Sequence, residues 1–121
     1  MFTGIHHISI LVSTEESIDF YKKLGFVESF RKIRKTDIIV LLDGYGMQLE
    51  VFIDSSHPGQ SEGKGEPLGL RHFALKTDDL KKTIVNLEKQ SIKVGEIDYD
   101  WIGTRYCYIT DPDGGLIELH E

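Results

Sequence analysis

Two histidines and two glutamates stand at matching places in the two halves of this 121-residue chain. His7 belongs to the segment IHHISILV, and His72 belongs to the similar segment LRHFALKT. Glu50 lies in MQLEVF, and Glu118 lies in GLIELH. Imidazole nitrogens and carboxylate oxygens form a donor set that suits a divalent transition metal ion, with bonds of about 2.0–2.2 Å. The repeated pattern therefore predicts a metal site built from these four side chains.

The strand patterns around these residues predict which way each side chain points. Successive residues of a strand point to opposite faces of a sheet, and each of the four residues alternates with an apolar row. The rows are Ile8, Ile10 and Val12 opposite His7; Met47, Leu49, Val51 and Ile53 opposite Glu50; Phe73 and Leu75 opposite His72; and Gly115, Ile117 and Leu119 opposite Glu118. We therefore expect the four ligands to face away from the helix-covered side and to converge if the sheets curl.

Taken one at a time, these residues have simpler interpretations. A lone histidine on a strand is more often hydrogen-bonded or exposed than bound to a metal, and a lone glutamate usually faces solvent. His6 lies on the core-facing row, so we expect it to be structural. His120 shares a face with Glu118 and is expected to be a satisfied neighbour or an outer-shell group. His57, in a glycine-rich segment, is expected to be a solvated loop residue.

Two weaker features leave more than one interpretation open. The aromatic residues Trp101, Tyr106 and Tyr108 could line a pocket, but packing in a core or interface is at least as plausible. Arg105 opens a strand and could bind an anionic substrate, although a surface salt bridge is the simpler expectation.

Hydrophobic periodicity and turn residues predict the same element order, βαβββ, in each half. Ser13 and Glu16 form a capping-box pattern at the start of the first helix, which Gly25 should end, and Thr77 or Asp78 should cap the second helix. The expected strands are 5–12, 26–34, 37–43, 46–53, 70–77, 92–99, 104–110 and 115–120, and the helices lie within 13–26 and 78–90.

The length predicts one domain over 1–121, made of two modules that each need the other to bury an apolar face. The first module is 1–53 and the second is 70–121. Between them, 54–69 is rich in Gly, Pro and Ser, which predicts a flexible linker.

The composition excludes several classes of protein. The net charge of −6 does not suit a nucleic-acid partner, which requires a basic surface. No apolar run approaches the roughly 20 residues of a membrane span, and the N-terminus lacks the pattern of a secretory signal. Cys107 is the single cysteine, so it forms no internal disulfide and is expected to be a buried small residue. We therefore expect a cytoplasmic protein.

The motifs HHISILV, SIDFYKKLGF, QLEVF, GLRHFAL and DPDGGLIELHE together resemble the vicinal oxygen chelate superfamily, which includes glyoxalase I, bleomycin and fosfomycin resistance proteins, dioxygenases and methylmalonyl-CoA epimerase. The resemblance covers essentially the whole chain and is strongest to small bacterial glyoxalase-I-like metalloproteins. It implies an α+β fold in which two βαβββ modules form an open, curved mixed sheet with the helices outside. It also implies that His7, Glu50, His72 and Glu118 occupy the four metal positions of the family.

The function implied by this resemblance is that of a metal-dependent lyase or isomerase, similar to lactoylglutathione lyase. Such an enzyme removes a carbon-bound proton from a small oxo or hydroxy substrate, such as a thiohemiacetal, and returns it to the neighbouring carbon through an enediolate. Glu118 would be the base and Glu50 its counterpart. The resemblance favours nickel or cobalt, with zinc possible, and a homodimer whose site lies in one chain or is shared by two.

The sequence departs from its relatives at two positions that bear on the substrate. Glutathione-dependent members often carry arginine in place of Leu11 and asparagine near Asp54, so the resemblance does not specify glutathione. The alternatives are a thiol transferase or dioxygenase on the same scaffold, which typically uses three ligands, and a non-catalytic small-molecule-binding protein. Glu50, as a fourth ligand, favours the isomerase.

Overall fold

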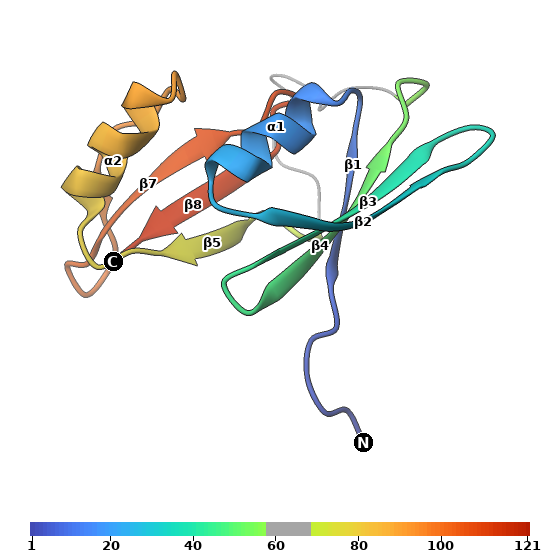
Figure 1. Ribbon diagram of the computed structural model, residues 1–121. Helices are drawn as coiled ribbons and strands as arrows, with labels where there is room; N and C mark the ends of the chain where they lie inside the picture. Colours follow the sequence, from blue (N-terminus) through green and yellow to red (C-terminus); the bar gives the residue numbers. More distant parts are fainter. Residues whose placement is uncertain (58–68) are drawn as a thin grey trace. The chain divides into compact units, whose positions relative to one another are not determined.

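The computed structural model describes residues 1–57 and 69–121, and the chain divides into two compact units, Met1–Pro58 and Gly59–Glu121 (Figure 1). Most of the predicted linker, 58–68, lies outside the described residues. Each unit consists of a strand, a helix and three further strands, which confirms the predicted α+β fold with a βαβββ repeat.

The first unit forms a four-stranded sheet in the order β1-β4-β3-β2. Strands β1 and β4 run parallel, whereas β3 runs antiparallel to both β4 and β2. Its elements are β1 (Ile8–Val12), α1 (Glu16–Lys23), β2 (Val27–Ile33), β3 (Ile38–Gly44) and β4 (Met47–Ile53).

The second unit repeats this topology with the order β5-β8-β7-β6. The first and last strands, β5 and β8, again lie parallel and adjacent, and β7 runs antiparallel to β8. Its elements are β5 (Phe73–Lys76), α2 (Leu80–Lys89), β6 (Asp98–Tyr99), β7 (Arg105–Thr110) and β8 (Leu116–His120).

The predicted alternation of buried and accessible residues is present in both central strands. On β4, Leu49 and Val51 are fully buried, and on β8, Ile117 is fully buried and Leu119 nearly so. Glu50 and Glu118 lie between these residues and are only partly buried. Burial of the apolar rows fixes the strand register, because a slip of one residue would expose each row and bury each glutamate. Core packing therefore determines which face carries the carboxylates.

Both helices begin later than the sequence suggests. The N-cap of α1 is Glu15, which makes no side-chain capping hydrogen bond, so the capping box predicted at Ser13 is not the start of the helix. The hydroxyl of Thr14 instead accepts from the backbone N–H of Glu16 at 3.3 Å. In α2 the cap is Asp79, whose carboxylate accepts from the N–H of Lys82 at 3.0 Å. Several adjacent polar residues can cap a helix, and the tertiary structure selects among them.

The predicted strand 92–99 is mostly absent. Only Asp98 and Tyr99 pair with β7, and upstream of them Gly95 makes one backbone hydrogen bond to Tyr108, at 2.9 Å. Ile92 is buried, directly after Ser91, whose φ is 62°. Ile92, one of the apolar residues that suggested a strand, is therefore buried in the core beside the end of α2 and does not pair in the sheet.

Gly25 ends α1 as predicted, through a Schellman motif. The N–H of Gly25 donates to Lys22 at 3.0 Å, and the N–H of Phe26 donates to Tyr21 at 3.2 Å. The φ of Gly25 is 105°, a conformation that side chains disfavour. A Cβ atom there would also collide with the hydroxyl of Tyr45, which donates to the carbonyl of Leu24.

Gly25→Ala is therefore expected to destabilise the protein by about 1–2 kcal/mol, measured as the free energy of unfolding in urea. Gly4→Ala is the matched control, because a Cβ atom at Gly4 would meet open space. An equal effect of the two substitutions would contradict the role assigned to Gly25.

Among the helices of the described residues, none has the length and hydropathy needed to cross a membrane.

Candidate metal centre

The register of the two parallel strand pairs places one histidine beside one glutamate in each unit. In the first unit Ser9 lies opposite Glu50, and in the second Ala74 lies opposite Glu118. In each case the histidine comes two residues before that partner, just ahead of the paired strand, and its side chain lies beside the glutamate of the same unit. Each unit therefore brings one histidine beside one glutamate, whereas the binding of all four to one metal ion stays a prediction.

The pair in the second unit is close. His72 Nε2 lies 2.7 Å from Glu118 Oε2, and the side chains are 18% and 15% exposed. The other ring nitrogen of His72, Nδ1, is buried and meets no hydrogen-bond partner among the described residues. Since Nε2 faces Glu118, Nδ1 is left, in the part of the chain that the structure describes, without the hydrogen bond that buried polar atoms usually make.

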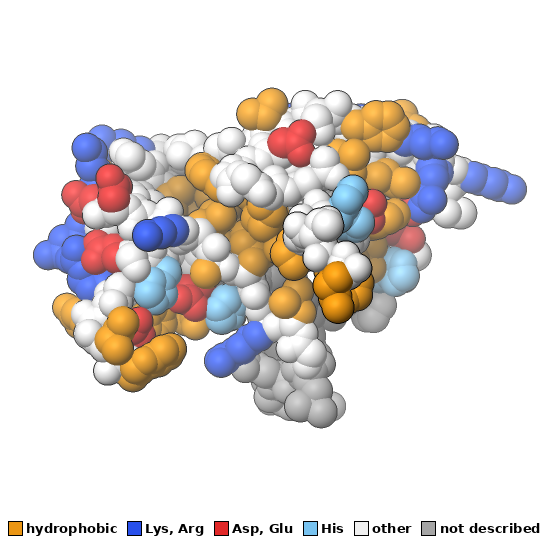
Figure 2. All heavy atoms as spheres, turned by 90° about the horizontal axis from the view of Figure 1, so that it is seen from below, with side chains coloured by type: hydrophobic (Ala, Val, Ile, Leu, Met, Phe, Trp, Pro, Cys, Tyr) orange, Lys and Arg blue, Asp and Glu red, His pale blue; other side chains and the backbone are white. Residues whose placement is uncertain are grey.

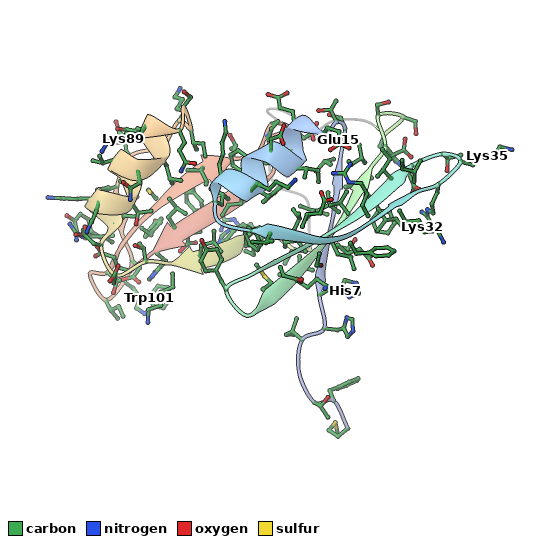
Figure 3. The ribbon with its side chains drawn as sticks, in the orientation of Figure 1. His7, Glu15, Lys32, Lys35, Lys89 and Trp101 are labelled. Carbon is green, nitrogen blue, oxygen red and sulfur yellow. The ribbon has the colours of Figure 1, made fainter. Side chains whose placement is uncertain are left out.

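The pair in the first unit is more open. His7 Nε2 lies 3.7 Å from Glu50 Oε1, and the side chains are 36% and 29% exposed. His7 lies where the N-terminal segment enters β1 (Figure 3). Its Nδ1 is 2.9 Å from Nδ1 of His6.

The prediction that His6 is a core residue is wrong, because His6 is exposed. The predicted strand 5–12 begins only at Ile8, so His6 lies ahead of the paired part of β1. Period-two alternation assigns a face only where the chain is held in a sheet.

The two pairs fit a divalent transition metal ion. Bonds of about 2.1 Å place neighbouring ligand atoms roughly 3.0–3.4 Å apart. The nitrogen–oxygen separations in the two pairs, 2.7 Å and 3.7 Å, lie just below and just above that range. The donor set of two imidazoles and two carboxylates suits nickel, cobalt or zinc. Across residues 1–57 and 69–121, no three His, Cys, Asp or Glu side chains form a group that could hold a metal ion, so the structure shows the candidate ligands as one pair in each unit.

A tight turn just before β8 fixes where this strand begins and so positions Glu118, the middle residue of the strand. The carboxylate of Asp111 accepts from the backbone N–H groups of Asp113, at 2.9 Å, and Gly115, at 2.7 Å. Asp111 is 7% exposed, so these bonds are shielded from water. Residues 111–114 therefore form a turn, and it fixes where β8 begins relative to β7.

Further polar groups surround Glu118. The Tyr108 hydroxyl donates to Glu118 Oε2 at 3.4 Å, and His120 Nε2 lies 3.8 Å from Glu118 Oε1. His120 is held by Asp100 Oδ2, at 3.2 Å from Nε2, and by the carbonyl of Glu121, at 2.7 Å from Nδ1. His120 is therefore a satisfied neighbour of Glu118, as predicted.

Sequence reasoning missed Asp100, which connects His120 to the loop between β6 and β7. Its Oδ1 accepts from the N–H groups of Ile102, at 3.0 Å, and Thr104, at 2.9 Å. Burial acts to raise the pKa of Asp100, but the N–H groups of Thr104 and Ile102, together with His120, leave this pKa below its usual value. The run D-W-I-G-T, an Asp followed by a glycine turn, was the available signal.

The other predicted residues have mostly structural roles. Arg105 forms the expected salt bridge, with its Nη2 atom 2.6 Å from Glu121 Oε1. Cys107 is buried, and burial raises the pKa of its thiol. His57 is exposed and lies 3.2 Å from Asp54. Trp101 is 93% exposed, so it does not pack in the core (Figure 3).

In the space-filling view, pale-blue histidine side chains lie beside red carboxylates on the face that is shown (Figure 2). The side chains of His7 and Glu50 are 36% and 29% exposed, and those of His72 and Glu118 are 18% and 15% exposed. The candidate ligands are therefore accessible to a small ligand.

Known proteins resemble this chain over its full length. The pattern of the Glyoxalase/Bleomycin resistance protein/Dioxygenase superfamily matches residues 4–119. The uncharacterized protein YwkD of Bacillus subtilis is 35% identical, and the match covers 100% of this chain and 98% of YwkD. A glyoxalase family protein from Enterococcus faecalis with a crystal structure is 34% identical in sequence. Its structure superposes on this one with a TM-score of 0.91, and the match covers 99% of this chain and 98% of that one.

More distant structures share the fold. A lactoylglutathione lyase from Agrobacterium tumefaciens is 20% identical, with a TM-score of 0.72, over 98% of this chain and 93% of its own. The fosfomycin resistance protein FosX from Listeria monocytogenes, in a complex with Mn(II), is 16% identical, with a TM-score of 0.77, over 99% of this chain and 93% of its own. Together with the match over 4–119, these similarities show that the chain belongs to the Glyoxalase/Bleomycin resistance protein/Dioxygenase superfamily.

Proposed function

We propose that this protein is a metal-dependent lyase or isomerase of the glyoxalase I type, in which His7, Glu50, His72 and Glu118 ligate one divalent metal ion. The observation that carries the proposal is the repeated His–Glu pair: in each unit a histidine just before the first strand lies beside a glutamate of the last strand. Membership of the superfamily supports it, because the family includes metal-dependent enzymes. Nickel or cobalt is favoured, and zinc is compatible with the same donors.

When bound, such an ion would polarise two adjacent substrate oxygens and stabilise the negative charge of an enediolate. Glu118 would take the carbon-bound proton and return it to the neighbouring carbon, with Glu50 as its near-symmetric counterpart. An ionised carboxylate within hydrogen-bond reach of a substrate can accept such a proton directly. Glu118 is the more enclosed of the two glutamates, with 15% of its side chain exposed against 29% for Glu50.

The substrate class follows from this chemistry. A small molecule with vicinal oxygens and an acidic C–H bond, such as the thiohemiacetal of a 2-oxoaldehyde, satisfies both requirements. The shared fold with a lactoylglutathione lyase is consistent with this class. Glutathione itself is not specified, since Leu11 and Asp54 stand where glutathione-dependent relatives often carry arginine and asparagine.

The proposal is tested by assaying methylglyoxal with several thiols on protein loaded with nickel, cobalt or zinc. Turnover above that of Glu118→Gln with at least one metal–thiol pair is expected. If no pair gives such turnover, the lyase assignment is wrong. Metal that binds without any turnover would favour a non-catalytic binding protein.

We also propose that the protein is a cytoplasmic homodimer, whose sites lie within one chain or are shared by two. Size-exclusion chromatography across a dilution series distinguishes these arrangements. A monomer that is stable to dilution and retains its full metal content would exclude a shared site.

A further inference from the structure

The two candidate ligand carboxylates have different surroundings, although their backbone positions are equivalent. On β7, Tyr108 lies directly opposite Glu118, and on β3, Leu41 lies directly opposite Glu50. Two residues beyond each glutamate, the second unit carries His120 and the first carries Phe52. Directly opposed residues share a face, so the neighbours of Glu118 are polar where those of Glu50 are apolar.

Tyr108 contacts both members of the His72–Glu118 pair. Its hydroxyl donates to Glu118 Oε2 at 3.4 Å, the same oxygen that lies 2.7 Å from His72 Nε2. Its ring meets the ring of His72 edge-on, with centroids 5.4 Å apart and planes at 74°. One side chain therefore restricts both the carboxylate and the imidazole.

The first unit has no comparable contact to Glu50 at the equivalent position, because leucine has no hydrogen-bond donor. Leu41 and Phe52 are half-buried there, and the guanidinium group of Arg34 lies 5.6 Å from the centre of the Phe52 ring. Arg34 is itself paired with Asp37, at 2.6 Å from Nε to Oδ1. Glu50 is thus held less firmly than Glu118.

We propose that Tyr108 is a positioning residue that orients Glu118 and His72, and that it makes Glu118 the better ordered of the two candidate ligand carboxylates. This inference rests on the proposed metal site and assigns to it a residue outside the four ligands. Groups that hydrogen-bond to a ligand fix its orientation, and their loss commonly weakens metal binding by about 10–100-fold.

The test is a titration of the full-length, metal-free protein with Co(II), followed by its visible absorption. Tyr108→Phe removes only the hydroxyl, and it is expected to weaken Co(II) binding by about tenfold or more and to change the absorption spectrum. Tyr108→Leu reproduces the residue found at position 41 and is expected to have at least the same effect. With saturating metal, both variants should lower kcat in the methylglyoxal assay with little change in KM, since positioning acts on the reacting geometry.

Tyr106→Phe is the matched control. Tyr106 lies on the same strand and stacks on His120, with ring centroids 6.2 Å apart, whereas the hydroxyl that donates to Glu118 is that of Tyr108. Removing the Tyr106 hydroxyl should leave the Co(II) affinity within about twofold of that of the unmodified protein. This is far less than the effect expected when a group that hydrogen-bonds to a ligand is removed. Circular dichroism confirms that each variant is folded.

The outcomes separate this inference from the proposed function. If the unmodified protein binds Co(II) and neither Tyr108 variant changes its affinity or spectrum, the role of Tyr108 is wrong and the proposed function stands. An equal effect of Tyr106→Phe would also overturn it. If the unmodified protein binds no Co(II), the proposed metal site fails, and the role of Tyr108 fails with it.

Discussion

Replacing Glu118 with glutamine is expected to lower kcat by about 10²–10⁴-fold, the usual contribution of a general base. Glutamine keeps the size of the side chain and an oxygen donor, but it cannot accept a proton at neutral pH. Metal binding should therefore be retained in part while turnover is lost. The measurement is kcat with saturating metal and saturating methylglyoxal–thiol adduct, and metal content is determined on the same sample.

Glu96→Gln is the control for this experiment, because Glu96 is exposed and lies outside the proposed site. It removes the same charge from the protein and should leave kcat unchanged. A Glu118→Gln variant as active as this control would show that another residue takes the proton.

Glu50→Ala is expected to remove both activity and tight metal binding. Glu50 is one of four proposed ligands. Its removal should therefore weaken metal binding by more than the roughly 10–100-fold that follows when a residue that only hydrogen-bonds to a ligand is removed. Equilibrium metal binding and turnover are measured together. Gln48→Ala is the control, since Gln48 lies two residues away on β4 and shares its face, where it donates to Asp43 at 3.0 Å.

The same variant distinguishes the lyase from the alternative enzymes. A thiol transferase or dioxygenase that uses only His7, His72 and Glu118 would retain metal and activity in Glu50→Ala. That result would contradict a four-ligand site.

The sequence is informative where one physical requirement dominates. Burial of one face of each sheet requires alternation, so the face that carries Glu50 and Glu118 could be predicted from Leu49, Val51, Ile117 and the other members of the apolar rows. A turn at 44–46 was also predictable, because glycine favours turns. The structure places Tyr45 and Gly46 at positive φ, which is typical of a two-residue hairpin. The βαβββ repeat followed from these local patterns.

The sequence is less informative where several neighbouring residues could play the same role. It is also less informative where a contact depends on how two strands are aligned. Thr77, Asp78 and Asp79 can all cap a helix, and the structure uses Asp79. The contact of Tyr108 with Glu118 arises because β7 and β8 pair in one particular register, which the alternation of each strand alone does not specify. Asp100 and His120 are 20 residues apart and meet only through the folded sheet.

The most direct test of a shared four-ligand centre is the metal content per chain of untagged protein, measured by elemental analysis after loading and dialysis. One ion per chain is predicted for the unmodified protein, and a large loss is predicted for His7→Ala and for His72→Ala, because each unit contributes an essential pair. Full retention of metal after either substitution, or two ions per chain that are lost independently, would contradict the account.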